Sequence, residues 1–107
     1  MLLTAAGNTG RKSSSFPENH PNQGVVSVTG LNSDETTRDS VASVADTLKY
    51  AAPFDVYSTT SYSYKYRDLT GTSFSPCHVS FLEVKDFFLL LIYLYNMSYS
   101  LLLNNSF

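Results

Sequence analysis

Short apolar runs separated by longer polar stretches mark the first 60 residues of the chain. Each run is bounded by Gly, Asn, Pro or Ser, which are common where strands end and turns begin. The spacing predicts short strands at residues 1–6, 25–31, 48–52 and 56–60. The Val-rich run at 25–31 predicts a mostly buried strand of a parallel sheet, because such strands are covered on both faces.

Three tyrosines then alternate with other residues, at positions 62, 64 and 66. Because side chains two residues apart point to the same side of a strand, these rings are predicted to share one face of a hairpin arm. Ordinary packing is favoured over a sugar- or base-stacking platform, since aromatic residues are favoured in strands.

The C-terminal residues 87–107 carry no charge and include the unbroken apolar run 87–95. The run is about half the ~20 residues that a membrane-spanning helix needs, and Asn96, Ser98 and Ser100 interrupt the segment after it. An apolar helix is predicted here, and membrane association of residues 87–103 stays open as an alternative. A third interpretation is a tail translated from a frameshift or an unspliced intron, because its residues have codons rich in A and T.

Composition limits the classes of protein. A chain of 107 residues with 43% hydrophobic positions supplies one modest core. The net charge of −2 without a basic cluster argues against nucleic-acid binding. The single Cys77 excludes an intramolecular disulfide framework, and the apolar run 1–3 is too short for a signal peptide, so the localisation is unknown from these residues.

The titratable residues of the polar loops suggest little chemistry. Four carboxylates are scattered over the loop 32–46 and are predicted to be solvated rather than catalytic. His20 lies in a polar loop and is predicted to be a surface residue rather than a general base. No cofactor is predicted, and no carboxylate cluster establishes a calcium site.

The segment Gly71–Val79 is the best candidate for catalytic chemistry. Ser73 follows a glycine and a threonine and is predicted to lie at a strand-to-helix junction. There the unpaired N–H groups and the dipole of a helix favour developing negative charge beside a nucleophilic hydroxyl. The alternative is a plain helix N-cap, a position in which Ser and Thr are common.

Five segments in order carry a resemblance over residues 1–80 to the subtilisin-like serine proteases, or subtilases. They are similar to the family segments A-A-G-N-x-G, Y-P-x-x-Y-P, V-I-A-V-G-A, A-P-G-x-x-I-x-S-T and G-T-S-M-A-x-P-H-V. The corresponding residues here are 4–10, 15–21, 24–30, 51–59 and 71–79.

The resemblance implies a partial subtilisin-like α/β fold, with a parallel sheet flanked by helices, over residues 1–80. Residues 81–107 then form a divergent apolar helical tail. It also implies hydrolysis of peptide bonds in a peptide or protein substrate, with Ser73 as the nucleophile and Asn8 as the oxyanion donor. Calcium is common in the family, which is largely secreted. The implied substrate-binding residues are Ala5, Ala6, Gly7 and Ser15.

The chain departs from the family pattern in several places. Phe54 and Phe81 stand where glycines are usual, and Glu83 stands where a small apolar residue is usual. The family's catalytic Asp and His motifs do not occur, and His78 matches no catalytic position. The chain is therefore interpreted as a fragment of a serine endopeptidase, predicted to be inactive and poorly soluble alone. The alternative is a non-catalytic remnant or a small membrane-associated protein.

Overall fold

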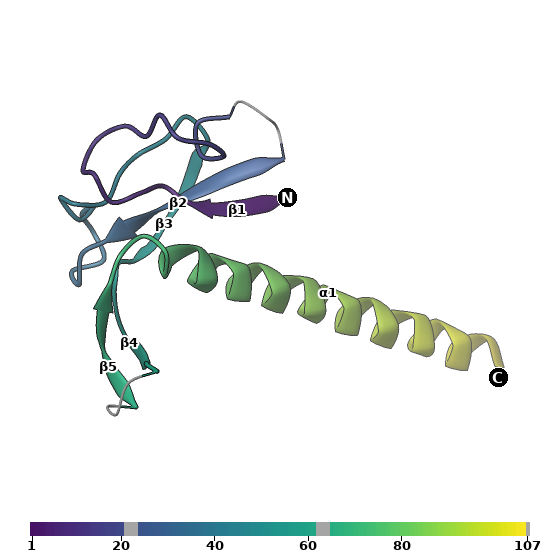
Figure 1. Ribbon diagram of the computed structural model, residues 1–107. Helices are drawn as coiled ribbons and strands as arrows, with labels where there is room; N and C mark the ends of the chain where they lie inside the picture. Colours follow the sequence, from purple (N-terminus) through teal and green to yellow (C-terminus); the bar gives the residue numbers. More distant parts are fainter. Residues whose placement is uncertain (21–23, 62–64, 107) are drawn as a thin grey trace.

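The computed structural model describes residues 1–20, 24–61 and 65–106, with side chains to residue 103. It has a mixed α/β architecture, with a small sheet, a hairpin and a long helix (Figure 1). The strands are β1 (Leu2–Ala5), β2 (Val25–Leu31), β3 (Leu48–Pro53), β4 (Asp55–Thr59) and β5 (Tyr66–Thr70), and the helix is α1 (Ser75–Ser106).

Strands β1, β2 and β3 form one parallel sheet with β2 in the centre. Leu3 pairs with Val26, and Gly30 pairs with Ala52 across the other side of β2. The predicted strands and their parallel arrangement are confirmed to within one or two residues at their ends.

Strand β2 is covered on both faces, as its Val-rich sequence predicted. Val28 is fully buried and packs with Ala52 of β3 and Val79 of α1 in a small core. Thr29 donates its hydroxyl to the carbonyl oxygen of Ser43 at 2.6 Å, which ties β2 to the loop that follows it. The apolar core is thus small, and buried hydrogen bonds supplement it.

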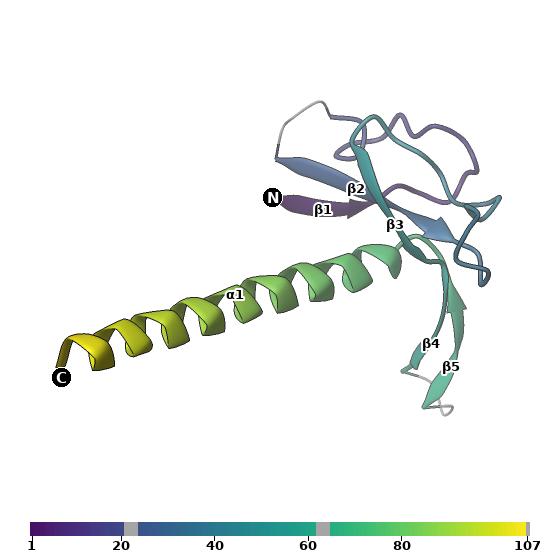
Figure 2. The ribbon, with the colours of Figure 1, turned by 180° about the vertical axis from the view of Figure 1, so that it is seen from behind.

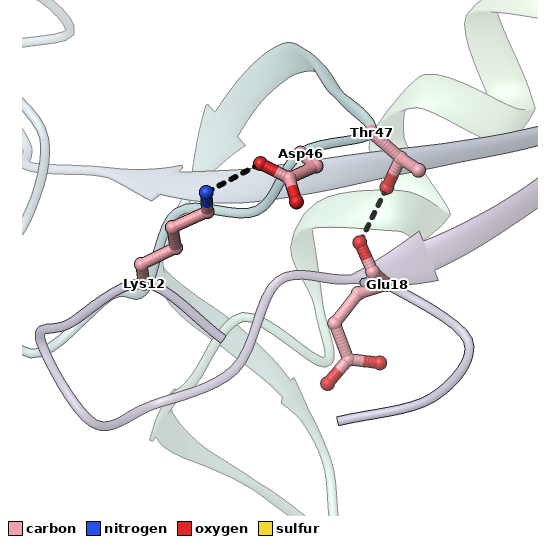
Figure 3. Close-up of polar contacts among 4 residues, drawn as sticks. All are labelled: Lys12, Glu18, Asp46 and Thr47. Atoms are coloured by element: carbon pink, nitrogen blue, oxygen red, sulfur yellow. Dashed lines mark hydrogen bonds and ion pairs between the residues drawn. The ribbon is translucent and has the colours of Figure 1, made fainter. Parts of the chain in front are cut away.

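The two long loops that connect the parallel strands pack against each other. Figure 3 shows two of the contacts. Lys12 Nζ lies 2.6 Å from Asp46 Oδ1, and Thr47 Oγ1 donates to the Glu18 carbonyl oxygen at 2.7 Å. The ion pair is exposed and contributes little, whereas Thr47 is buried. Asp34, Glu35 and Asp46 are exposed, as predicted for the carboxylates of this loop, whereas Ser43 in the same loop is fully buried.

The hairpin of β4 and β5 is antiparallel and extends away from the parallel sheet (Figure 1). Tyr66 lies on its solvent side, 54% exposed, and stacks on Tyr57 of the neighbouring strand with 5.9 Å between ring centroids. The hairpin arm predicted at Tyr66 is confirmed. Tyr62 and Tyr64, predicted on the same face, lie outside the described residues.

Helix α1 packs on the sheet only through its first turns and then projects away from the body (Figures 1 and 2). Val79 is buried, whereas the large apolar side chains from Phe81 onwards are exposed. The resemblance implied several flanking helices, but α1 is the only helix in the described part of the chain. Among these residues, no helix combines the length and the hydrophobicity that crossing a membrane requires.

Gly30 of β2 makes room for the side chain of Phe54. A Cβ atom added at Gly30 would lie 2.8 Å from the Cβ of Phe54, whose side chain is buried.

Gly30→Ala is therefore expected to lower the free energy of unfolding by about 1–3 kcal/mol through overpacking. Urea unfolding measures the change. Ser27→Ala is the matched control on the same strand, because it removes a buried hydroxyl that has no hydrogen-bond partner among the described residues. A Gly30→Ala protein as stable as this control would contradict the packing.

Helix α1 and strand β3 also meet in a polar contact with a pH dependence. Tyr50 donates its hydroxyl to Glu83 Oε1 at 3.2 Å, and this hydrogen bond together with the charge of Glu83 raises the pKa of Tyr50. The Tyr50–Glu83 hydrogen bond therefore contributes to stability below the ordinary pKa of tyrosine. This contribution is lost as the pH rises through the raised pKa of Tyr50. Glu83→Gln should lower the pKa of Tyr50 in an NMR titration of its ring carbon. Asp86→Asn, the control on the same helix, should leave it unchanged.

Candidate functional site

The turn between β5 and α1 presents Ser73 to solvent, two residues before the helix begins. Gly71 has a φ of +141°, a conformation that residues with side chains rarely adopt. Its N–H donates to the Phe54 carbonyl oxygen at 3.1 Å. Buried Ser75 donates its hydroxyl to the Pro53 carbonyl oxygen at 3.0 Å, so the start of α1 is fixed against the end of β3.

Asn8 meets this turn from the far end of the sequence, three residues after β1. Its Oδ1 accepts hydrogen bonds from the Thr72 backbone N–H at 2.9 Å and from the Thr72 hydroxyl at 3.0 Å. Thr72 Oγ1 in turn accepts the Gly7 N–H at 3.0 Å. Because a backbone N–H can only donate, the side-chain atom of Asn8 that faces Thr72 must be the oxygen.

Because Asn8 Oδ1 faces Thr72, the amide nitrogen of Asn8 remains as a hydrogen-bond donor. It and the backbone nitrogen of Ser73 both lie near Gly71. The position that a Cβ on Gly71 would occupy lies 3.6 Å from Asn8 Nδ2, 3.9 Å from the Ser73 nitrogen and 4.0 Å from Asn8 Oδ1. Neither nitrogen has a hydrogen-bond partner within the described ranges. Both nitrogens are neutral hydrogen-bond donors, and both belong to or adjoin the turn that carries Ser73.

Ser43 holds the backbone on both sides of Asn8. Its N–H donates to the Gly7 carbonyl oxygen at 2.8 Å, and its hydroxyl oxygen accepts the Thr9 N–H at 3.0 Å. Sequence reasoning assigned no role to Ser43 or to Thr72. The only available signal for Thr72 was its place inside the motif. Ser43 had none, because Gly7 and Thr9, its partners at this site, lie 36 and 34 positions away.

The site lies at the carboxyl edge of the parallel sheet. Asn8 follows the end of β1, and the Gly71 turn is hydrogen-bonded to Phe54, which follows the end of β3. In open α/β sheets this edge is where ligands bind, because loops from neighbouring strands meet there.

The four residues that the resemblance implies for substrate binding differ in burial and in distance along the chain from Asn8. Ala5 and Gly7 are half-buried next to Asn8, but Ala6 has no exposed surface, so it supports the loop from within. Ser15 is exposed in the loop between β1 and β2. No hydrogen bond joins Ser15 to Gly7, Asn8 or Thr72 in the part of the chain that the structure describes.

Neither histidine of the chain is hydrogen-bonded to Ser73. His78 is exposed on α1, and His20 is exposed in its loop, where its ring meets the Phe16 ring edge-on at 5.7 Å. Ser73 Oγ has no hydrogen-bond partner among the described residues. The site therefore combines a serine hydroxyl and two donors without a base in contact with that hydroxyl.

Within the described residues, no group of three or more His, Cys, Asp or Glu side chains could hold a metal ion. No protein-family model matches the chain, and no curated protein matches it either.

Proposed function

We propose that this chain is the C-terminal portion of a subtilisin-like catalytic domain and belongs to a serine endopeptidase. The observation that carries the proposal is the meeting of Asn8 with the Gly71–Ser73 turn, which leaves two donors beside one point. Those segments are 64 positions apart, and both were singled out by the resemblance.

In the proposed reaction, Ser73 Oγ attacks the carbonyl carbon of a peptide bond, and the carbonyl oxygen gains negative charge. Asn8 Nδ2–H and the Ser73 N–H donate to that oxygen, and their neutrality suits a group that is charged only during the reaction. The proton of Ser73 must go to a base. No hydrogen bond joins His20 or His78 to Ser73 in the described part of the chain, so we assign the base to a histidine outside these 107 residues.

Fluorophosphonate labelling of the native source tests the proposal. Trypsin cleaves after Arg67 and Lys85, so one peptide, residues 68–85, carries Ser73. We expect a label on Ser73 in a protein of roughly 250 residues or more, the size of a whole domain of this kind. A 68–85 peptide that is present in the same digest but never labelled would overturn the proposal.

The second candidate function is a non-catalytic remnant, favoured by the lack of a hydrogen-bond partner for Ser73 Oγ in the described part of the chain. Both candidates predict that the 107-residue chain alone, produced recombinantly, is labelled no faster than its Ser73→Ala variant, because no base activates the hydroxyl. Labelling above that control would show that His20 or His78 reaches Ser73 in solution. The two candidates therefore separate only in the native source.

A further inference from the structure

Two adjoining hollows lie where the first turns of α1 pack against the sheet. The first has a volume of about 560 Å³ and lies between β3 and α1. The second has a volume of about 420 Å³ and lies between the loop after β2 and the start of β4. The two hollows share the lining residues Leu31, Glu35, Pro53 and His78, so they form one continuous groove.

The deepest part of the groove is apolar. Ala52 of β3 and Val79 of α1 belong to the core and are 6% and 7% exposed. Leu82 lies on the same face of α1 as Val79, three positions further along, and is 54% exposed. An apolar ligand group placed here would cover Leu82 and extend the core.

Carboxylates surround this apolar part. Four of the nine carboxylates of the chain line the two hollows, and we call the whole surface the acidic groove. Glu35 lies in the loop after β2, Asp55 begins β4, and Glu83 and Asp86 are on α1. None of the four is in an ion pair within residues 1–20, 24–61 and 65–106.

The basic side chains of neighbouring segments do not neutralise the acidic groove. Lys49 and Lys85 adjoin lining residues in the sequence, but neither lines a hollow. Arg38 donates a hydrogen bond to the carbonyl oxygen of Ala42 in its own loop. Among the described lining residues, His78 is the one side chain that can carry positive charge. The groove therefore presents uncompensated negative charge around an apolar centre.

A hollow on another face of α1 shows that this combination is specific to one side of the helix. It has the same volume, about 560 Å³, and its described lining residues carry no charge. Phe81 and Val84 contribute its apolar surface, together with Leu3 of β1. We call it the neutral hollow, and it serves below as the internal control for the acidic groove.

We propose that the acidic groove binds a peptide segment of a partner protein in which basic and apolar side chains are neighbours. Apolar side chains of the segment cover Ala52, Val79 and Leu82, and its lysine or arginine side chains meet the carboxylates. Complementary charge of this kind selects a partner and orients it. Neither Ser73 nor Asn8 lines either hollow, so this binding is independent of the peptidase activity proposed above.

The spread of the carboxylates favours an extended segment over a single cation. They come from a loop, a strand and a helix, and they are divided between two hollows. In the part of the chain that the structure describes, no three such groups are placed to hold one metal ion. A chain with basic side chains at intervals reaches more of these carboxylates than one compact cation does.

Fluorescence anisotropy with the full chain and a labelled hexapeptide of alternating leucine and lysine is the first test. We expect saturable binding of this peptide. Hexapeptides of alternating leucine and serine, or of alternating serine and lysine, should bind roughly 10-fold more weakly, because each lacks half of the complementary chemistry. A leucine–lysine peptide that does not bind saturably would overturn the proposal. So would a control peptide that binds equally well.

Two double variants with the same change in net charge locate the binding site. Glu35→Gln with Asp86→Asn removes two charges from the acidic groove, and Glu83 is kept because it accepts the Tyr50 hydroxyl. We expect the Kd for the leucine–lysine peptide to rise roughly 10-fold. Asp46→Asn with Asp68→Asn removes two exposed charges outside the groove and should leave the Kd unchanged. Equal effects would trace the binding to net charge and overturn the proposal.

A second pair of variants tests the apolar part of the site. Leu82→Ala shortens a side chain of the acidic groove, and Val84→Ala shortens one of the neutral hollow. Both side chains are more than half exposed on the same helix. We expect Leu82→Ala to raise the Kd roughly 5-fold and Val84→Ala to leave it unchanged. Equal losses would show that the peptide covers the exposed apolar surface of α1 in general, and a larger loss in Val84→Ala would place it in the neutral hollow. Either result overturns the proposal.

Discussion

Thr72→Val is expected to lower the free energy of unfolding by about 2–3 kcal/mol, because its buried hydroxyl joins two segments that are 65 positions apart. That hydroxyl accepts the Gly7 N–H and donates to Asn8 Oδ1, both at 3.0 Å. Valine has nearly the same shape but leaves the Gly7 N–H without a partner. Unfolding in urea, followed by circular dichroism at one protein concentration, measures the change.

Thr72→Ser is the control for this prediction. It keeps the hydroxyl and removes one methyl group, so we expect a loss of only about 1 kcal/mol. A serine variant as unstable as the valine variant would show that packing of the methyl group, and not the pair of hydrogen bonds, holds the turn against Asn8.

The sequence predicted the parts of the fold that depend on local pattern. The strand positions followed from apolar runs between turn residues, and the parallel sheet followed from the Val-rich run in β2, which is covered on both faces. Ser73 was predicted at a strand-to-helix junction, and it lies between the end of β5 and the start of α1. Each of these features is determined within about ten residues of the chain.

The features that could not be predicted depend on contacts between distant segments. Ser43 lies in a polar loop whose carboxylates were predicted to be solvated, but Ser43 itself is fully buried because the loop folds back over Gly7 and Thr9. Thr72 is buried for the same reason. The apolar pattern of α1 likewise predicted a helix, but whether that helix is covered depends on which surfaces lie beside it.

Asn8→Asp is expected to reduce the reactivity of Ser73 by about 10²–10³-fold in the full-length product proposed above, because it removes one oxyanion donor. The remaining oxygen can still accept both hydrogen bonds from Thr72, so the local fold should be retained. The second oxygen replaces the donor with an acceptor and adds negative charge where the oxyanion would form. The rate of fluorophosphonate labelling at Ser73 is the measurement.

Asn19→Asp is the matched control, since it makes the same change of amide to carboxylate in the loop between β1 and β2. We expect this variant to be labelled at the unchanged rate. Equal losses in the two variants would trace the effect to net charge. An unchanged labelling rate in Asn8→Asp would show that Asn8 is not an oxyanion donor. The label on Ser73 would still identify Ser73 as the nucleophile. The two roles assigned to this site are therefore tested separately, one by the label and the other by its rate.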